Sequence, residues 1–191
     1  MMFYVFIVIA YLLGCINPSI IQGKLAGVDI RKEGSGNAGT TNTLRVLGKK
    51  AALVSLIVDI GKGALAVGLG SIEGRTCAYI CAVAVMIGHI LPVFYGFKGG
   101  KGVAAAFGAA LSVNWKLALC ALAIALIMVL VSRRMSVGSI VAAAGLAVLS
   151  VFLEHGFWPY ALVIAAIIIF KHKSNIKRLL KGEEPPLNFK K

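Results

Sequence analysis

The polar segment 34–45, which reads GSGNAGTTNTLR, has the residue types of an anion-binding loop. Glycines free the backbone to turn, small polar side chains donate hydrogen bonds, and Arg45 adds a permanent forked cation. The alternative is a solvated loop of turn residues, but such a loop between two apolar runs would ordinarily be shorter or more charged. We therefore expect Ser35, Asn37 and Arg45 to contact a substrate phosphate.

A second segment, 97–103, reads FKGGKGV and feeds a glycine turn directly into an apolar run. Backbone N–H groups and the positive end of a helix would then face a phosphate, held by Gly99, Gly100 and Gly102, and Lys101 would add a point charge. The glycine-to-lysine spacing is not that of a nucleotide P-loop, and no Ser or Thr follows the lysine to hold magnesium. The pattern thus predicts phosphate binding, whereas Lys98 needs no role beyond topology.

The third segment, 172–179, leaves the last apolar run and reads HKSNIKRL. His172 and Asn175 are one helical turn apart and would share a face, where they could orient a substrate that carries a hydroxyl group. A basic tail that only sets topology is the strong alternative.

The other titratable groups are expected to be structural. Asp59 and Lys62 lie three residues apart inside an apolar run, where a mutually neutralised pair is favoured over a proton relay. His89 and His155 are likewise assigned structural roles. The four cysteines fall in apolar stretches without ligand spacing, so we expect neither a disulfide nor a metal site.

The elements that must position these segments are membrane helices. Of the 191 residues, 59% are hydrophobic and 14% are charged, which excludes an ordinary soluble domain. The net charge of +13 does not indicate nucleic acid, because the charges lie between apolar runs instead of on one soluble face. The first run lacks the basic start and the cleavage site of a secretory signal, so we expect it to be retained.

A membrane crossing takes roughly 20 apolar residues, and the bilayer forces them into helix. The expected spans are 2–21, 51–70, 76–94, 137–152 and 157–170. The stretch 103–131 is read as two short helices that turn at Asn114. The fold class is therefore an all-α integral membrane protein, a single domain of about seven transmembrane helices over residues 1–191.

Seven spans place 17 of the 20 Lys and Arg residues on one side, which the positive-inside rule makes cytoplasmic. Only Arg75 and Lys116 face the other side, and Lys62 lies within a span. The N-terminus is then outside and the C-terminus cytoplasmic. The three polar segments would converge if the helices pack as a bundle around a cytoplasmic opening.

Together these segments resemble the three signature motifs of the bacterial membrane glycerol-3-phosphate acyltransferases that use acyl phosphate. The resemblance covers essentially the whole chain. It rests on residues 34–37, 41–42, 45 and 48, then 88–89, 92–94 and 97–104, and finally 172, 175, 178–179, 182 and 184–185.

The resemblance implies transfer of a fatty acyl group from acyl phosphate to the primary hydroxyl of sn-glycerol 3-phosphate, giving lysophosphatidic acid and inorganic phosphate. The implied catalytic residues are Ser35, Arg45 and Lys101 on the acyl phosphate, with His172 and Asn175 on the acceptor hydroxyl, and Ser139 is expected to assist. It implies no cofactor, no metal and no nucleic acid, a bacterial cytoplasmic membrane with lipids around a monomer, and an active site facing the cytoplasm.

Soluble-type glycerolipid acyltransferases use a His followed by an Asp five residues on. Here the residues five after His89, His155 and His172 are Phe94, Tyr160 and Lys177. A small anion or organophosphate transporter is the alternative from another class, but it would need polar residues through the spans. A purely structural membrane subunit would not need the glycines around Lys101.

Overall fold

The computed structural model describes residues 2–187, and every regular element in that range is helical. The described residues form two compact units, 2–113 and 114–187. Five helical stretches are long and apolar enough to cross a membrane, and a sixth would be the bent pair formed by the last two helices. This confirms the all-helical membrane class, while the count of seven spans and the single domain stay predictions.

The N-terminal unit begins with α1 (Met2–Cys15) and α2 (Pro18–Leu25), which share one apolar stretch. The prediction of one unbroken helix over 2–21 was wrong at residues 16 and 17. Proline lacks the backbone N–H that a helix needs and disfavours helical backbone in the residue before it. Asn17 instead caps α2, because its side chain accepts a hydrogen bond from the Ile20 N–H at 3.0 Å.

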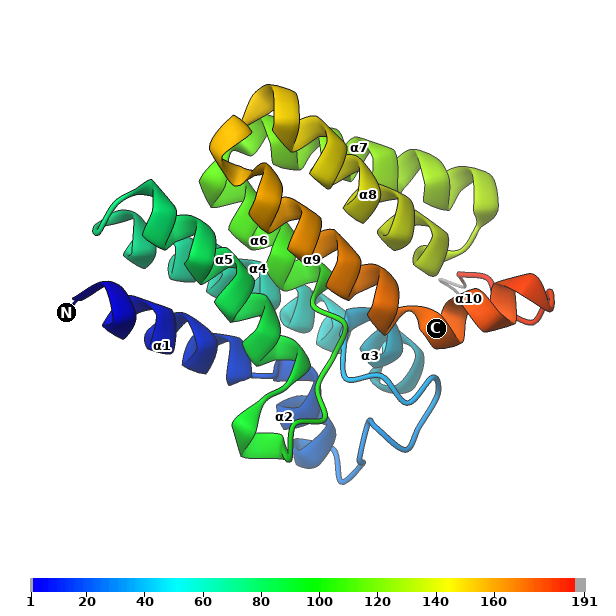
Figure 1. Ribbon diagram of the computed structural model, residues 1–191. Coiled ribbons are helices and arrows are strands. Elements are labelled where there is room, and N and C mark those ends of the chain that lie inside the picture. The colour runs from blue at the N-terminus through cyan, green and yellow to red at the C-terminus, as the bar shows by residue number, and fades with distance from the viewer. Residues whose placement is uncertain (1, 188–191) are drawn as a thin grey trace. The chain divides into compact units, whose positions relative to one another are not determined.

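The remaining helices of this unit are α3 (Thr40–Leu47), α4 (Lys49–Ser71), α5 (Arg75–Ile90) and α6 (Val103–Val113). A short 3-10 helix, η1 (Val93–Tyr95), follows α5. The α1 and α5 helices run side by side, and α4 packs against both α5 and α6 (Figure 1). Glycine permits close approach at these contacts, since a Cβ on Gly63 of α4 would lie 2.1 Å from the Ala105 carbonyl oxygen.

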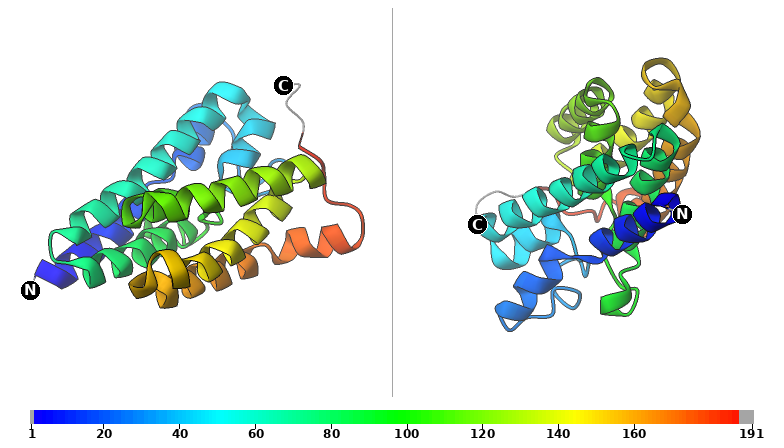
Figure 2. Two further views of the ribbon diagram at one scale, coloured as in Figure 1. Left: turned by 90° about the horizontal axis from the view of Figure 1, so that it is seen from above. Right: turned by 90° about the vertical axis from the view of Figure 1, so that its left-hand side faces the viewer.

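The C-terminal unit contains α7 (Trp115–Ser132), α8 (Met135–Leu153), η2 (His155–Phe157), α9 (Trp158–Lys171) and α10 (Lys173–Leu180). The α8 helix packs between α7 and α9, and Figure 2 shows α7 and α8 lying along each other. The predicted turn at Asn114 is confirmed, because its side chain caps α7 by accepting hydrogen bonds from the N–H groups of Lys116 and Leu117.

Candidate active site

The loop before α3 is held in shape by one buried side chain, Asn42, which is 1% exposed. Its Oδ1 accepts a hydrogen bond from the Ser35 N–H at 2.8 Å, and its Nδ2 donates to the carbonyls of Ile30 and Glu33, both at 3.0 Å. Gly34 has a φ of +59°, which glycine adopts without strain. Asn42 therefore presents Ser35, which is exposed, on a fixed backbone.

The second half of this loop is pinned to the start of α2. Asn17 donates from Nδ2 to the Ala38 carbonyl at 3.2 Å, and the Thr43 hydroxyl donates to Ser19 at 2.8 Å. Among the described residues, the Thr40 hydroxyl oxygen is buried and has no hydrogen-bond partner. The loop thus keeps one polar atom available at the first turn of α3, close in sequence to the half-buried Asn37.

Arg45 lies on the last turn of α3 and is half-buried. Within residues 2–187 it has no ion-pair partner, whereas Arg31 pairs with Asp29 at 2.9 Å. The hydrogen bond from Arg31 lowers the pKa of the Asp29 carboxyl below its ordinary value. The guanidinium of Arg45 is therefore not neutralised by a protein carboxylate.

The segment 97–102, here called the glycine-lysine loop, packs against the end of α5. The N–H groups of Gly99 and Gly100 donate to the carbonyls of Ile90 and His89, at 3.2 and 3.1 Å. A Cβ on Gly99 would lie 2.1 Å from the His89 carbonyl oxygen, and Gly102 has a φ of +82°. These glycines therefore serve close packing and a turn.

This geometry narrows which backbone groups of the loop can meet an anion. Two of the N–H groups expected to cradle phosphate already bind α5 carbonyls. The first N–H groups of any α-helix lack partners within the helix, so those that open α6 are the ones suited to a phosphate. Lys101, half-buried, precedes them directly.

The two predicted phosphate segments meet at Gly100. A Cβ on Gly100 would lie 2.6 Å from the Ala38 carbonyl oxygen and 2.1 Å from His89 Nε2. The structure therefore brings the segment of Ser35, Asn37 and Arg45 together with the glycine-lysine loop inside the N-terminal unit.

In the C-terminal unit, His172 lies at the junction of α9 and α10, where the chain bends by 56°. It is 3% exposed, and its Nδ1 lies 2.8 Å from the Ile168 carbonyl oxygen. A carbonyl can only accept, so Nδ1 carries the proton and, in the neutral ring, Nε2 is the acceptor. Asn175 lies on α10, one turn after His172, as predicted.

Glu184 fixes the chain after α10 and was not among the predicted site residues. Its Oε1 accepts hydrogen bonds from Ser136 at 2.8 Å and from Asn175 at 2.7 Å, and its Oε2 accepts one from Arg178 at 2.7 Å. Burial raises the pKa of the carboxyl, but the bonds from Asn175, Ser136 and Arg178 outweigh it and hold that pKa below its ordinary value. Glu184 thereby orients Asn175.

Ser139 lies on the first turns of α8 and is half-buried. Its hydroxyl donates to the Met135 carbonyl at 2.9 Å, which leaves the oxygen as an acceptor. The C-terminal unit thus holds Ser139, His172 and Asn175, and the convergence of all three polar segments stays a prediction.

Two anchors, Asn42 and Glu184, were missed as functional residues. Both belong to stretches that carry the family resemblance, yet the hydrogen-bond partners of an Asn or a Glu cannot be predicted from its spacing in the sequence. The one available signal for Glu184 was a carboxylate within a strongly basic tail.

Comparison with known proteins gives a consistent result. Residues 4–182 match the family model described as glycerol-3-phosphate acyltransferase. The glycerol-3-phosphate acyltransferase of Thermoanaerobacter sp. (strain X514) is 44% identical, over 96% of this chain and 94% of its own, and that of Shewanella oneidensis is 41% identical, over 97% and 93%. The crystal structure of PlsY (YgiH), an integral membrane glycerol 3-phosphate acyltransferase, in its glycerol 3-phosphate form is 36% identical, with a TM-score of 0.93 and coverage of 97% of this chain and 96% of that one.

Proposed function

The chain belongs to the glycerol-3-phosphate acyltransferase family, and from that premise we propose how its residues carry out the reaction. The enzyme transfers a fatty acyl group to the sn-1 hydroxyl of glycerol 3-phosphate and so makes lysophosphatidic acid for phospholipid synthesis. The donor is acyl phosphate, and inorganic phosphate is released.

The reaction does not require a strong general base from the protein. The acceptor hydroxyl oxygen attacks the acyl carbonyl carbon, the bond from that carbon to the phosphate oxygen breaks, and phosphate leaves with its electron pair. Acyl phosphate is an activated mixed anhydride, so positioning and stabilisation of developing charge supply most of the rate. We assign the hydroxyl proton to an oxygen of the substrate phosphate.

The N-terminal unit supplies the groups for the donor phosphate. Arg45, which no protein carboxylate neutralises, and Lys101 provide positive charge, and Ser35 and Asn37 provide hydrogen-bond donors. The N–H groups that open α6 add the positive end of a helix. The observation that carries this assignment is the contact of Gly100 with Ala38, which joins the two anion-binding segments.

The C-terminal unit supplies the groups for the acceptor. His172 has an acceptor nitrogen, Nε2, suited to a hydroxyl proton donor, and Asn175 is oriented by Glu184. Ser139 adds a hydroxyl oxygen on α8. These contacts would hold glycerol 3-phosphate so that its sn-1 hydroxyl oxygen can attack, and they need no His with a following Asp.

We further place the protein in a bacterial cytoplasmic membrane as a monomer, with the N-terminus outside and the active site facing the cytoplasm. The support is the charge distribution. In each unit, the basic residues gather at the end that carries the site segments, and Arg75 and Lys116 begin the helices at the opposite end.

The test uses purified protein in detergent or a lipid mesophase with palmitoyl phosphate and glycerol 3-phosphate. We expect phosphate release that depends on the acceptor, and none when acyl-CoA or acyl carrier protein replaces the donor. Release from acyl-CoA at a similar rate would contradict the donor assignment. A folded protein that releases no phosphate from any donor would contradict the enzyme and favour transport.

A further inference from the structure

A buried charge cluster lies beneath the place where the two phosphate segments meet. It consists of Asp59 and Lys62 on α4 and His89 on α5, which are 1%, 5% and 3% exposed. Lys62 Nζ lies 2.8 Å from Asp59 Oδ1 and 2.8 Å from His89 Nδ1, and His89 Nδ1 lies 3.2 Å from Asp59 Oδ1. The predicted Asp59 and Lys62 pair is therefore present, with a third member that the sequence did not indicate.

Lys62 also supplies the hydrogen bonds that are missing at the break between α1 and α2. Because Pro18 has no N–H, the Gly14 carbonyl loses its helical donor, and because the Ile20 N–H bonds to Asn17, the Ile16 carbonyl loses its donor too. Lys62 Nζ donates to both carbonyls, at 3.0 and 2.6 Å. A carbonyl without a hydrogen-bond donor is strongly unfavourable in a membrane interior, so these two bonds stabilise the break.

His89 connects this cluster to the glycine-lysine loop. Its Nδ1 faces Asp59 and Lys62, its Nε2 lies against Gly100, and its backbone carbonyl accepts the Gly100 N–H. Gly100 in turn contacts the Ala38 carbonyl, which Asn17 holds. One imidazole thus lies between a rigid, charged helix junction and the residue before Lys101.

We infer that Asp59, Lys62 and His89 are positioning residues for the reaction. Through His89 the cluster fixes Gly100, and therefore Lys101 and the start of α6, against the segment that carries Ser35 to Arg45. The inference rests on the proposed function, because it assigns the held loop to the phosphate of the donor. None of the three residues contacts substrate.

The primary test replaces His89 by Gln, which leaves the Asp59 and Lys62 pair and both carbonyl contacts in place. We expect the KM for acyl phosphate to rise about tenfold, and the KM for glycerol 3-phosphate to stay within about threefold. Backbone amides of residues 98–102 should exchange with solvent at least about tenfold faster in hydrogen-exchange mass spectrometry. If His89→Gln does not fold, Asp59→Asn is measured in the same way.

The matched control is Val67→Ala. Val67 is also buried on α4, at 1% exposed, but it lies about two helical turns beyond Asp59. We expect it to lower the melting temperature without changing either KM or the exchange at 98–102.

The outcomes separate the two ideas. A folded His89→Gln or Asp59→Asn variant with unchanged KM for acyl phosphate and unchanged exchange at 98–102 would overturn the inference, and so would an equal rise in KM in Val67→Ala. If the unmodified protein releases no phosphate from acyl phosphate, the proposed function fails. The exchange measurement then still decides whether the cluster holds the loop.

Discussion

Lys101 and Lys98 lie in the same loop, but their surroundings differ. Lys98 is exposed, whereas Lys101 is half-buried and follows glycines that are packed against α5. A charge held on a fixed backbone in a partly dry site stabilises a phosphate more than a mobile one in water. The same reasoning applies to Arg45, which lies in the last turn of a short helix anchored through Asn42 and Thr43.

The first prediction concerns these two cations. Lys101→Ala and Arg45→Ala should each reduce kcat/KM for acyl phosphate by about 100-fold or more, because each removes a charge that we assign to the reacting phosphate. Lys98→Ala is the matched control and should keep activity near that of the unmodified enzyme. Melting temperatures should stay unchanged in all three. Turnover of Lys101→Ala equal to that of Lys98→Ala would refute the assignment.

At the scale of residues, the types that bind anions could be predicted from the sequence, whereas their anchors could not. The glycines, Arg45 and Lys101 could be recognised as anion-binding residues from their types and spacing. Asn42 acts through carbonyls at residues 30 and 33, and such contacts depend on the loop conformation. The backbone of Gly99 and Gly100 was likewise expected to bind ligand, but it binds α5, which only the packing reveals.

Among the elements, the contact between α4 and α6 depends on glycine. Gly63 and Gly61 are both on α4, but a Cβ on Gly63 would meet the Ala105 carbonyl at 2.1 Å, whereas one on Gly61 would meet nothing within 4 Å. The glycine-lysine loop leads directly into α6, so the packing of α6 against α4 also sets the position of the loop.

The second prediction compares these two glycines. Gly63→Ala should lower the melting temperature and the activity together, because the backbones of α4 and α6 must separate. Gly61→Ala should be neutral, or more stable by up to about 1 kcal/mol, since alanine is the better helix former. Thermal unfolding followed by tryptophan fluorescence gives the melting temperature of each variant, and phosphate release gives its activity. Equal losses in the two variants would show that the close contact is not the cause.

Glu184 joins α8, α10 and the chain that follows α10, which leads to the third prediction. Its pKa lies below the ordinary value of 4.5, so the folded state gains stability from the ionised carboxylate above that pH. This stability is lost as the pH falls through the lower, folded pKa. Glu184→Gln should therefore lower the melting temperature at pH 7 and reduce its further drop below about pH 4.5.

Glu183→Gln is the control for this change. Glu183 is the neighbouring carboxylate and is exposed, so its replacement should leave the melting temperature and its dependence on pH unchanged. An unaltered acid response in Glu184→Gln would show that the hydrogen bonds from Ser136, Asn175 and Arg178 do not depend on its charge.

Most helices could be predicted from the sequence, because long apolar runs permit little else in a membrane. The expected ends at 51 and 70 lie within two residues of those of α4, and the turn at Asn114 is where the structure has it. The break before Pro18 was missed, since the surrounding run is apolar on both sides. Its stability depends on Lys62, which is 44 residues away, and no local pattern contains that contact.

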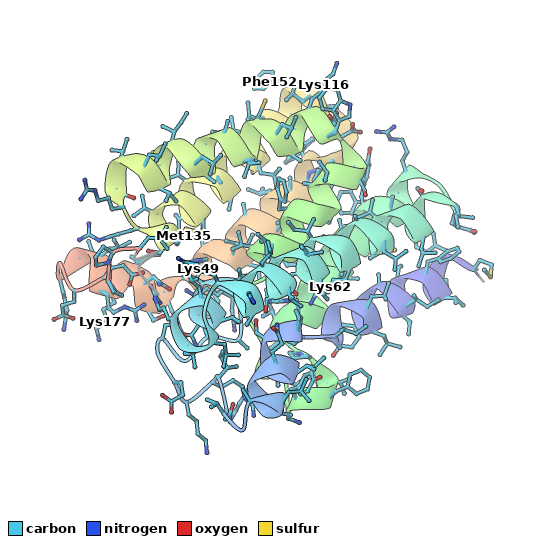
Figure 3. All side chains as sticks on the ribbon, turned by 180° about the vertical axis from the view of Figure 1, so that it is seen from behind. Lys49, Lys62, Lys116, Met135, Phe152 and Lys177 are labelled. Atoms are coloured by element: carbon cyan, nitrogen blue, oxygen red, sulfur yellow. The ribbon has the colours of Figure 1, made fainter. Side chains whose placement is uncertain are left out.

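At the scale of the whole molecule, charge is distributed unevenly within each unit. In the C-terminal unit, Met135 and Lys177 lie at one end, and Lys116 and Phe152 lie at the other (Figure 3). Arg133, Arg134 and the basic residues of α10 belong to the first end. Such an asymmetry is what the positive-inside rule requires of a membrane protein with a fixed orientation.

The fourth prediction uses this asymmetry to decide whether α6 crosses the membrane. The helix has 11 residues, which span only about 16 Å at 1.5 Å per residue. Seven spans nevertheless require Lys98 and Lys116, on either side of it, to face opposite compartments. Single cysteines at 75, 98, 116 and 177 would be treated in whole cells with a membrane-impermeant maleimide, with the unmodified chain as background for the native cysteines.

We expect labelling at 75 and 116 in intact cells, and at 98 and 177 only after the membrane is permeabilised. Labelling at 98 and protection at 75 would invert the orientation. Protection of both 98 and 116 in intact cells would instead mean that α6 does not cross the membrane, which gives six spans and moves residue 177 to the outside. In that case the short helix would stay in the cytoplasmic half of the bilayer, because a run of this length spans only about half of a 30 Å hydrocarbon core.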